Sequence, residues 1–146
     1  MIGWWVACAQ PVVPALDAPS AEERWRALVV RDRAALVAEV DAVIALARSD
    51  PDPRVRAAAL RHLAYTEDPR FLEVAEGVRG TDAEADAIVA AAFHPGGCEL
   101  LVRWWATTPA EYGVPVDLRL YDAFVEAGRH AVDCPLERSY RSRPSR

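Results

Sequence analysis

Residues 50–69, which read D-P-D-P-R-V-R-A-A-A-L-R-H-L-A-Y-T-E-D-P, decide the fold. Asp52 is a good helix N-cap residue, because its carboxylate can accept hydrogen bonds from the free amides of a first turn. Pro53 suits the first helical position, where no amide donor is needed. Asp68-Pro69 repeats this arrangement in front of the next apolar pattern. The stretch therefore predicts one complete helix and the start of another.

Apolar residues at helical spacing extend this prediction in both directions. The pattern i, i+3, i+4, i+7, i+8 occurs twice: as Val55, Ala58, Ala59, His62 and Leu63, and again as Ala85, Ile88, Val89, Ala92 and Phe93. A partial match at the same interval earlier in the chain contains Trp25, Leu28 and Val29. Ser20-x-x-Glu23 and Thr81-x-x-Glu84 have the spacing of capping boxes. We expect the residues of these stripes to pack in the core.

Further helices are expected between these, with apolar residues at 36–47, 71–78 and 101–108, and a last helix is expected over about 115–132. The connections are short, which predicts that neighbouring helices run antiparallel. Self-similarity at such a period is typical of stacked hairpins, each of which buries its apolar face only against its neighbours. We therefore predict an all-α fold, a short α-solenoid of antiparallel helical hairpins with about five to seven helices.

The segment after Asp52 resembles the first helix of a HEAT repeat. That motif has Pro at the helix start, Val-Arg shortly after, and small residues followed by Leu on the packing face. The matching residues are Pro53, Val55, Arg56, Ala59, Leu60 and Leu63. The resemblance covers residues 50–111, although residues 82–93 lack the Pro and Arg of the pattern. It implies a scaffold whose second helices line a concave binding face.

Three segments follow from this interpretation. Residues 1–19 are expected to be an irregular N-terminal segment, residues 20–133 a HEAT-like helical repeat domain, and residues 134–146 an Arg-rich flexible tail. Abundant alanine and a basic complement made only of arginine are typical of a GC-rich, bacterial genome.

Charge and composition limit the partners of the 146-residue chain. Its net charge of −5 repels a phosphate backbone, which argues against nucleic acid as a partner and favours a basic protein. No apolar run approaches the ~18 residues that would span a membrane. Three cysteines cannot all pair within one chain, and the first residues lack the basic region of a signal peptide. We therefore expect a cytoplasmic protein.

The function predicted from these features is a non-enzymatic protein–protein interaction module or scaffold, such as an inhibitor or immunity-type binder of a basic partner. Its contact residues are expected on the polar face of the second helices, at Arg70, Glu73, Glu76, Glu99 and Arg103. A merely solvated face is the alternative for these residues. The chain is expected to be a monomer, or a homodimer through an open solenoid end that includes Trp4, Trp5 and the last helix.

The alternative function is a small helical enzyme that depends on zinc or on a thiol. His94, Cys98, His130 and Cys134 form the pattern H-x3-C twice, and imidazole and thiolate are preferred zinc ligands. Cys98 could also act as a nucleophile with His94 as its base. Against this, a histidine near a helix end complements the helix dipole, and a free cysteine packs like a small apolar residue. The main interpretation needs no cofactor, and Gly96-Gly97 is expected to end one helix and turn the chain.

Overall fold

The computed structural model describes residues 13–108, 110–111, 114–115 and 118–130. Within these ranges the chain forms eight helices and one short two-stranded ribbon. The helices are α1 (Ala21–Val30), α2 (Arg33–Ala38), α3 (Val40–Ser49), α4 (Pro53–Tyr65), α5 (Arg70–Gly77), α6 (Glu84–Ala91), α7 (Gly97–Thr107) and α8 (Leu118–His130). The ribbon pairs β1 (Ala110–Glu111) antiparallel with β2 (Val114–Pro115). The predicted all-α class is confirmed.

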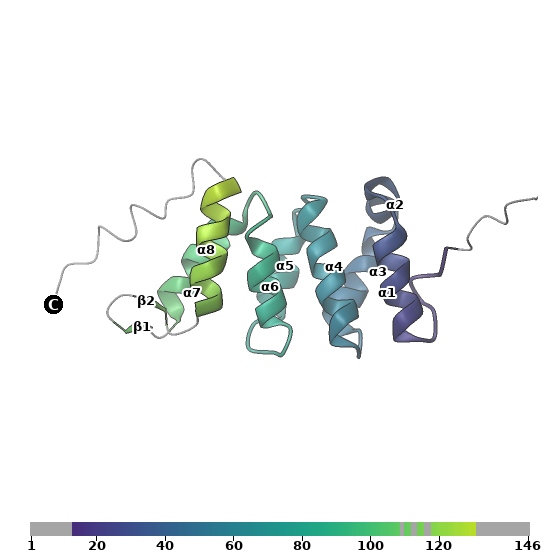
Figure 1. Ribbon diagram of the computed structural model, residues 1–146, viewed down its shortest axis with the longest axis horizontal. Helices are drawn as coiled ribbons and strands as arrows, with labels where there is room; N and C mark the ends of the chain where they lie inside the picture. The colour runs from purple at the N-terminus through teal and green to yellow at the C-terminus, as the bar shows by residue number, and fades with distance from the viewer. Residues whose placement is uncertain (1–12, 109, 112–113, 116–117, 131–146) are drawn as a thin grey trace, which may run out of the picture.

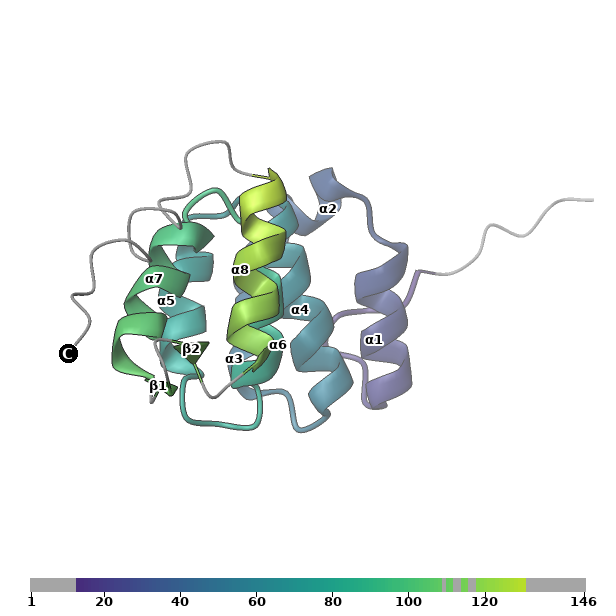
Figure 2. The ribbon, with the colours of Figure 1, turned by 60° about the vertical axis from the view of Figure 1, so that its left-hand side comes forward.

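The helices lie in two rows. The first helices of the hairpins, α1, α4, α6 and α8, stand side by side and contact one another in that order (Figure 1). The helices α3, α5 and α7 form the second row behind them, as both ribbon views show (Figure 2). None of the described helices is long and apolar enough to cross a membrane.

The core fills the space between the two rows. Its largest fully buried side chains come from helices of both rows and include Leu28, Val43, Leu60, Phe71, Leu101 and Trp104. Alanines such as Ala59, Ala87 and Ala91 are also fully buried, and their small side chains let neighbouring helices approach closely.

The predicted helix starts are largely confirmed. Asp52 accepts a hydrogen bond from the Arg54 amide at 2.8 Å, and Pro53 is the first residue of α4. The Ser20 hydroxyl accepts from the Glu23 amide at 3.2 Å, as in a capping box. The second box differs, because the Glu84 carboxylate accepts from the Gly80 amide at 2.7 Å and α6 begins only at Glu84.

Two predicted helices have different bounds in the structure. The helix expected over residues 36–47 is broken at Glu39, whose backbone angles (φ −106°, ψ 23°) leave the helical region. The Glu39 carboxylate is paired with Arg31, which also donates to the Ala27 carbonyl oxygen at 2.8 Å. Because of this break, the described residues form eight helices where the sequence patterns predict seven. The helix expected from residue 115 begins at Leu118, after the ribbon.

A repeated arginine contact joins successive hairpins. Arg24 donates to both oxygens of Asp50, at 2.6 and 3.0 Å, and to the carbonyl oxygens of Ala18 and Pro19 just before its own helix. Asp50 is buried, and the guanidinium neutralises its charge there.

Arg56 repeats this set of contacts one hairpin later. It donates to the carbonyl oxygens of Asp50 and Pro51, before its own helix, and to the carboxylate of Asp82. In both cases the carboxylate lies 26 residues after the arginine. The interval from Arg24 to Arg56, taken once more along the chain, reaches Ile88 instead of a third arginine. The contact therefore defines two equivalent hairpin junctions.

Candidate functional site

The second-helix face, the outer polar surface that we expected to bind a partner, is joined by ion pairs between neighbouring helices. Arg70 on α5 pairs with Asp41 on α3 at 2.8 Å and with Asp68 at 3.0 Å. Glu73 pairs with Arg48 on α3, also at 2.8 Å. Most charges on this face are therefore offset by a neighbouring helix rather than left for a partner.

Glu76 serves the fold as well as the surface. It accepts hydrogen bonds from the indole Nε1 of Trp104, at 3.0 Å, and from Arg103, at 3.1 Å. Burial raises the pKa of Glu76, but these two hydrogen bonds, together with the charges of Arg103 and Arg79, outweigh burial and the net shift is downward. The Arg79 guanidinium lies 5.2 Å from the centre of the Trp104 ring. Glu76 therefore anchors the buried tryptophan of α7 to α5.

Glu99 differs from the other predicted contact residues. It is exposed in the first turn of α7, and it makes no ion pair with any residue that the structure describes. The structure thus brings Arg70, Glu73, Glu76 and Arg103 into inter-helix pairs and leaves Glu99 apart. Because arginines offset most of its carboxylates, the second-helix face attracts a basic partner less strongly than those carboxylates alone would.

His94 is buried and both of its ring nitrogens are occupied. Nδ1 accepts a hydrogen bond from the Gly96 amide at 3.0 Å, so Nε2 carries the proton and donates to the Asp68 carbonyl oxygen, also at 3.0 Å. The ring stacks on Phe71 with centroids 5.0 Å apart. A ligand or base role would require His94 to give up one of these bonds.

Cys98 is buried at the start of α7 and is disulfide-bonded. A cysteine in a disulfide offers no thiolate, either as a zinc ligand or as a nucleophile. The His130 side chain and Cys134 lie outside what the structure describes. Among the described residues, no three His, Cys, Asp or Glu side chains gather where they could hold a metal ion. Zinc and thiol chemistry therefore receive no support from His94 and Cys98 in this arrangement.

Stability is expected to fall when His94 is forced to take up a second proton. Burial lowers its pKa below the ordinary 6.5, although hydrogen bonding to Asp68 partly opposes this. Because the unfolded chain then binds the proton more readily than the folded one, the free energy of unfolding should decrease as the pH falls below 6.5.

Urea unfolding over a pH series, for the wild type and for His94→Gln, measures this effect. The variant should lose a large part of the pH dependence below neutrality. Part of what remains should come from His62, whose pKa is also lowered by burial and by Arg61. At more acidic pH, carboxylates whose pKa is lowered, such as Asp52 and Asp68, add to it. Identical pH profiles for the two proteins would show that His94 does not contribute.

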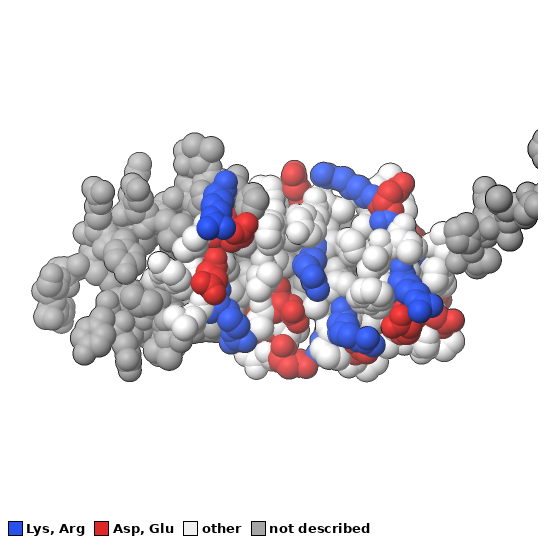
Figure 3. Space-filling model, in the orientation of Figure 1, with Lys and Arg blue, Asp and Glu red and all other residues white. Residues whose placement is uncertain are grey.

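The opposite surface of the molecule, formed by the first helices, is more apolar than predicted. Five large apolar side chains there are 41–67% exposed: Val29, Tyr65, Val89, Leu118 and Val125. Val29 and Val89 belong to the stripes that we expected to be buried, and that expectation is wrong for both. Figure 3 shows uncharged surface running between scattered charged side chains across α1, α4 and α6. We call this surface the first-helix face.

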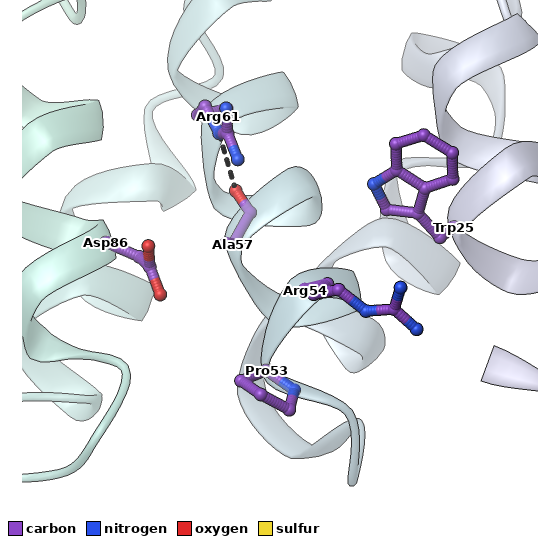
Figure 4. A pocket seen from close by; sticks show the side chains of 6 residues that line it. All are labelled: Trp25, Pro53, Arg54, Ala57, Arg61 and Asp86. Atoms are coloured by element: carbon purple, nitrogen blue, oxygen red, sulfur yellow. Dashed lines mark hydrogen bonds between the residues drawn. The ribbon is translucent and has the colours of Figure 1, made fainter. Parts of the chain in front are cut away.

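A groove of about 430 Å³ crosses the first-helix face at α4. Ala57 lies in it on α4, while Trp25 borders it from α1 and Asp86 from α6 (Figure 4). The other lining residues are Pro53, Arg54 and Arg61. Val29, Tyr65 and Val89 each follow a lining residue by one helical turn, so they continue the same surface.

The groove holds two opposite charges that are not used in ion pairs among the described residues, Arg61 and Asp86. Arg61 makes only a long hydrogen bond, of 3.4 Å, to the Ala57 carbonyl oxygen. Burial raises the pKa of Asp86, and the guanidinium groups of Arg61 and Arg56 offset only part of that rise. Asp86 is half-buried, whereas Arg61 is exposed. A half-buried carboxylate without a close partner is costly to keep, which makes Asp86 and the neighbouring Arg61 candidates for contacts with a bound molecule.

The sequence does indicate this exposed apolar face, although helical periodicity alone does not distinguish it from the buried packing face. The stripes around Leu28 and Ile88 are wider than one buried face needs, since continuous apolar runs at residues 27–30 and 87–93 extend around the helix. Such width indicates a second apolar contact surface.

No protein-family model matches the chain, and searches of curated proteins and of solved structures also return no match.

Proposed function

We propose that the chain is a non-enzymatic protein-binding module, built as a short HEAT-like α-solenoid, that takes its partner on the first-helix face. The observation that carries this proposal is the set of large apolar side chains exposed there, from Val29 on α1 to Val125 on α8. Contiguous exposed apolar surface with charges interspersed is typical of protein interaction sites.

The solenoid part of the proposal is supported by the repeated junction. Arg24 and Arg56 make equivalent contacts in two successive hairpins, and the resemblance to HEAT repeats lies in the helix that carries Arg56. An array in which each hairpin contacts only its neighbours exposes one long surface per row, which suits a scaffold.

The second-helix face and its basic partner stay a prediction, with weaker support. Its charges at Arg70, Glu73 and Arg103 are offset by neighbouring helices, whereas burying the exposed valines of the first-helix face would add affinity directly. An inhibitor or immunity-type role fits either face. The cytoplasmic location also stays a prediction, and the disulfide at Cys98 favours an oxidising compartment instead.

Capture from an extract of the cells that make the protein tests the choice of face. The bait proteins are the wild type, Val29→Asp/Val89→Asp on the first-helix face, and Glu73→Ala/Glu99→Ala on the second. We expect the valine double variant to reduce recovery of the specific partner at least ~tenfold, because each aspartate replaces apolar contact with a charge that must be desolvated.

The glutamate double variant is the matched control and should bind like the wild type. Circular dichroism should show that both variants remain folded, since all four replaced residues are exposed. Loss of binding by the glutamate variant alone would reject the proposed face. It would support the second-helix face instead.

A further inference from the structure

Charge is divided unequally between the two helices at the centre of the first-helix face. The helix α4 carries three arginines, Arg54, Arg56 and Arg61, and no acidic residue. The neighbouring α6 carries Glu84 and Asp86 and no basic residue. Arg54 and Arg56 are already paired with Asp52 and Asp82, and Glu84 lies 3.9 Å from Arg79. Because α4 and α6 lie side by side, the division of charge at the centre of the face therefore comes from Arg61 on α4 and Asp86 on α6.

A surface divided in this way is complementary to itself. A two-fold axis that runs parallel to the helices, between α4 and α6, places α4 of one molecule opposite α6 of a second. Two-fold symmetry then repeats the attraction, since α6 of the first molecule faces α4 of the second. An axis perpendicular to the helices would instead place α4 against α4, where the arginines repel one another.

The same axis brings apolar surface onto apolar surface. It places α1 of one molecule opposite α8 of the other, because these helices stand at equal places on either side of α4 and α6. Val29 and the half-buried Trp25 on α1 would then meet Leu118 and Val125 on α8. The outer helices supply the apolar contact and the inner helices supply the orientation.

We propose that the partner on the first-helix face is a second copy of this chain, held in a two-fold dimer in which Arg61 of each molecule pairs with Asp86 of the other. The inference rests on the proposed function, because it names the partner of the same face. A second copy accounts at once for Arg61 and Asp86, neither of which forms an ion pair within the described part of the chain. It also accounts for the apolar side chains on the two outermost helices.

Charge reversal tests this arrangement by sedimentation velocity over a range of concentrations. The wild type should dimerise with a dissociation constant in the micromolar range or tighter. Arg61→Asp and Asp86→Arg should each weaken self-association at least ~tenfold, because each variant faces two like-charge pairs.

Mixing the two variants gives the decisive result. In a heterodimer of Arg61→Asp with Asp86→Arg the two introduced charges face each other and are opposite, and the native Asp86 of one molecule faces the native Arg61 of the other. Both contacts are then attractive, so the mixture should associate with close to wild-type affinity although each variant alone does not. The variant Arg61→Asp/Asp86→Arg restores opposite charges at both contacts and should self-associate with close to wild-type affinity. Arg48→Asp and Glu99→Arg make the same charge changes away from this face and should leave the affinity unchanged.

A chain that stays monomeric at all concentrations would overturn the inference. So would a dimer that is insensitive to both charge reversals, which would point to another interface such as the open end of the helix array. Neither result bears on the capture experiment with Val29→Asp/Val89→Asp. If the wild type captures a different protein and Val29→Asp/Val89→Asp does not, the first-helix face binds a partner other than a second copy of the chain.

Discussion

Replacing Trp104 by alanine is expected to lower the free energy of unfolding by about 3–5 kcal/mol. The side chain is among the largest that are fully buried, and its indole lies against Glu76 of the neighbouring α5. Its removal leaves a cavity between α7 and α5. It also takes away the indole hydrogen bond to the partly exposed Glu76.

Denaturant unfolding followed by circular dichroism measures this loss, and two further variants separate its causes. Trp104→Phe keeps most of the apolar volume but cannot donate to Glu76, so it should lose a smaller part of the stability. Val30→Ala, at an exposed position on α1, should change stability by less than about 0.5 kcal/mol. An equally small effect of Trp104→Ala would contradict the packing that the structure shows.

Trp104 also illustrates what the sequence can predict about this fold. Its helical spacing with Leu101 placed it correctly on a packing face, and the Asp-Pro pairs located the starts of α4 and α5 to within a residue or two. These features depend on neighbours within one or two turns, so local periodicity and capping are enough to find them.

The contacts that hold the hairpins to one another could not be predicted in the same way. Arg24 and Asp50 are 26 residues apart, and so are Arg56 and Asp82, so no local pattern connects the members of either pair. Once the structure shows the first pair, the sequence contains the second at the same spacing. The contact made by Arg24 and again by Arg56 is therefore a repeat that shows in the charged residues rather than in the apolar ones.

The pairing of the predicted contact residues could not be predicted for a related reason. Glu73 and Glu76 lie on the polar side of their helix, as predicted, but their arginine partners come from other helices and offset their charge. Val89, by contrast, fits a packing stripe and is nevertheless exposed. Helical periodicity shows that a residue shares a face with its neighbours, and only the arrangement of the rows decides what that face contacts.

The junction between α6 and α7 provides the second prediction with a large expected effect. Gly97 is the first residue of α7, rather than part of a turn between helices as the sequence suggested. A Cβ added there would lie 1.7 Å from the carbonyl oxygen of Ala91, the last residue of α6. The Ala91 carbonyl group belongs to the backbone and cannot move aside as the end of a side chain can. Gly97→Ala must therefore push α7 away from α6.

We expect Gly97→Ala to lower the free energy of unfolding by about 3 kcal/mol or more, because displacement of α7 also disturbs Leu100 and Trp104 in the core. Gly96→Ala should cost less, since its added Cβ would meet the movable end of Leu72 at 2.9 Å. Gly77→Ala has open space around it and should be neutral or raise stability by up to about 1 kcal/mol.

Denaturant unfolding of the three variants should therefore rank Gly97→Ala below Gly96→Ala, and Gly96→Ala below Gly77→Ala. The comparison of Gly97→Ala with Gly77→Ala separates steric contact from helix propensity, because propensity alone would favour alanine at both of these helical positions. Gly96 is the N-cap of α7, where glycine is preferred over alanine. Equal stabilities for the three proteins would mean that α6 and α7 do not meet through backbone at Gly97. The contact of Gly97 with the backbone of α6 would then not explain how α7 is held in the position that directs Trp104 toward Glu76.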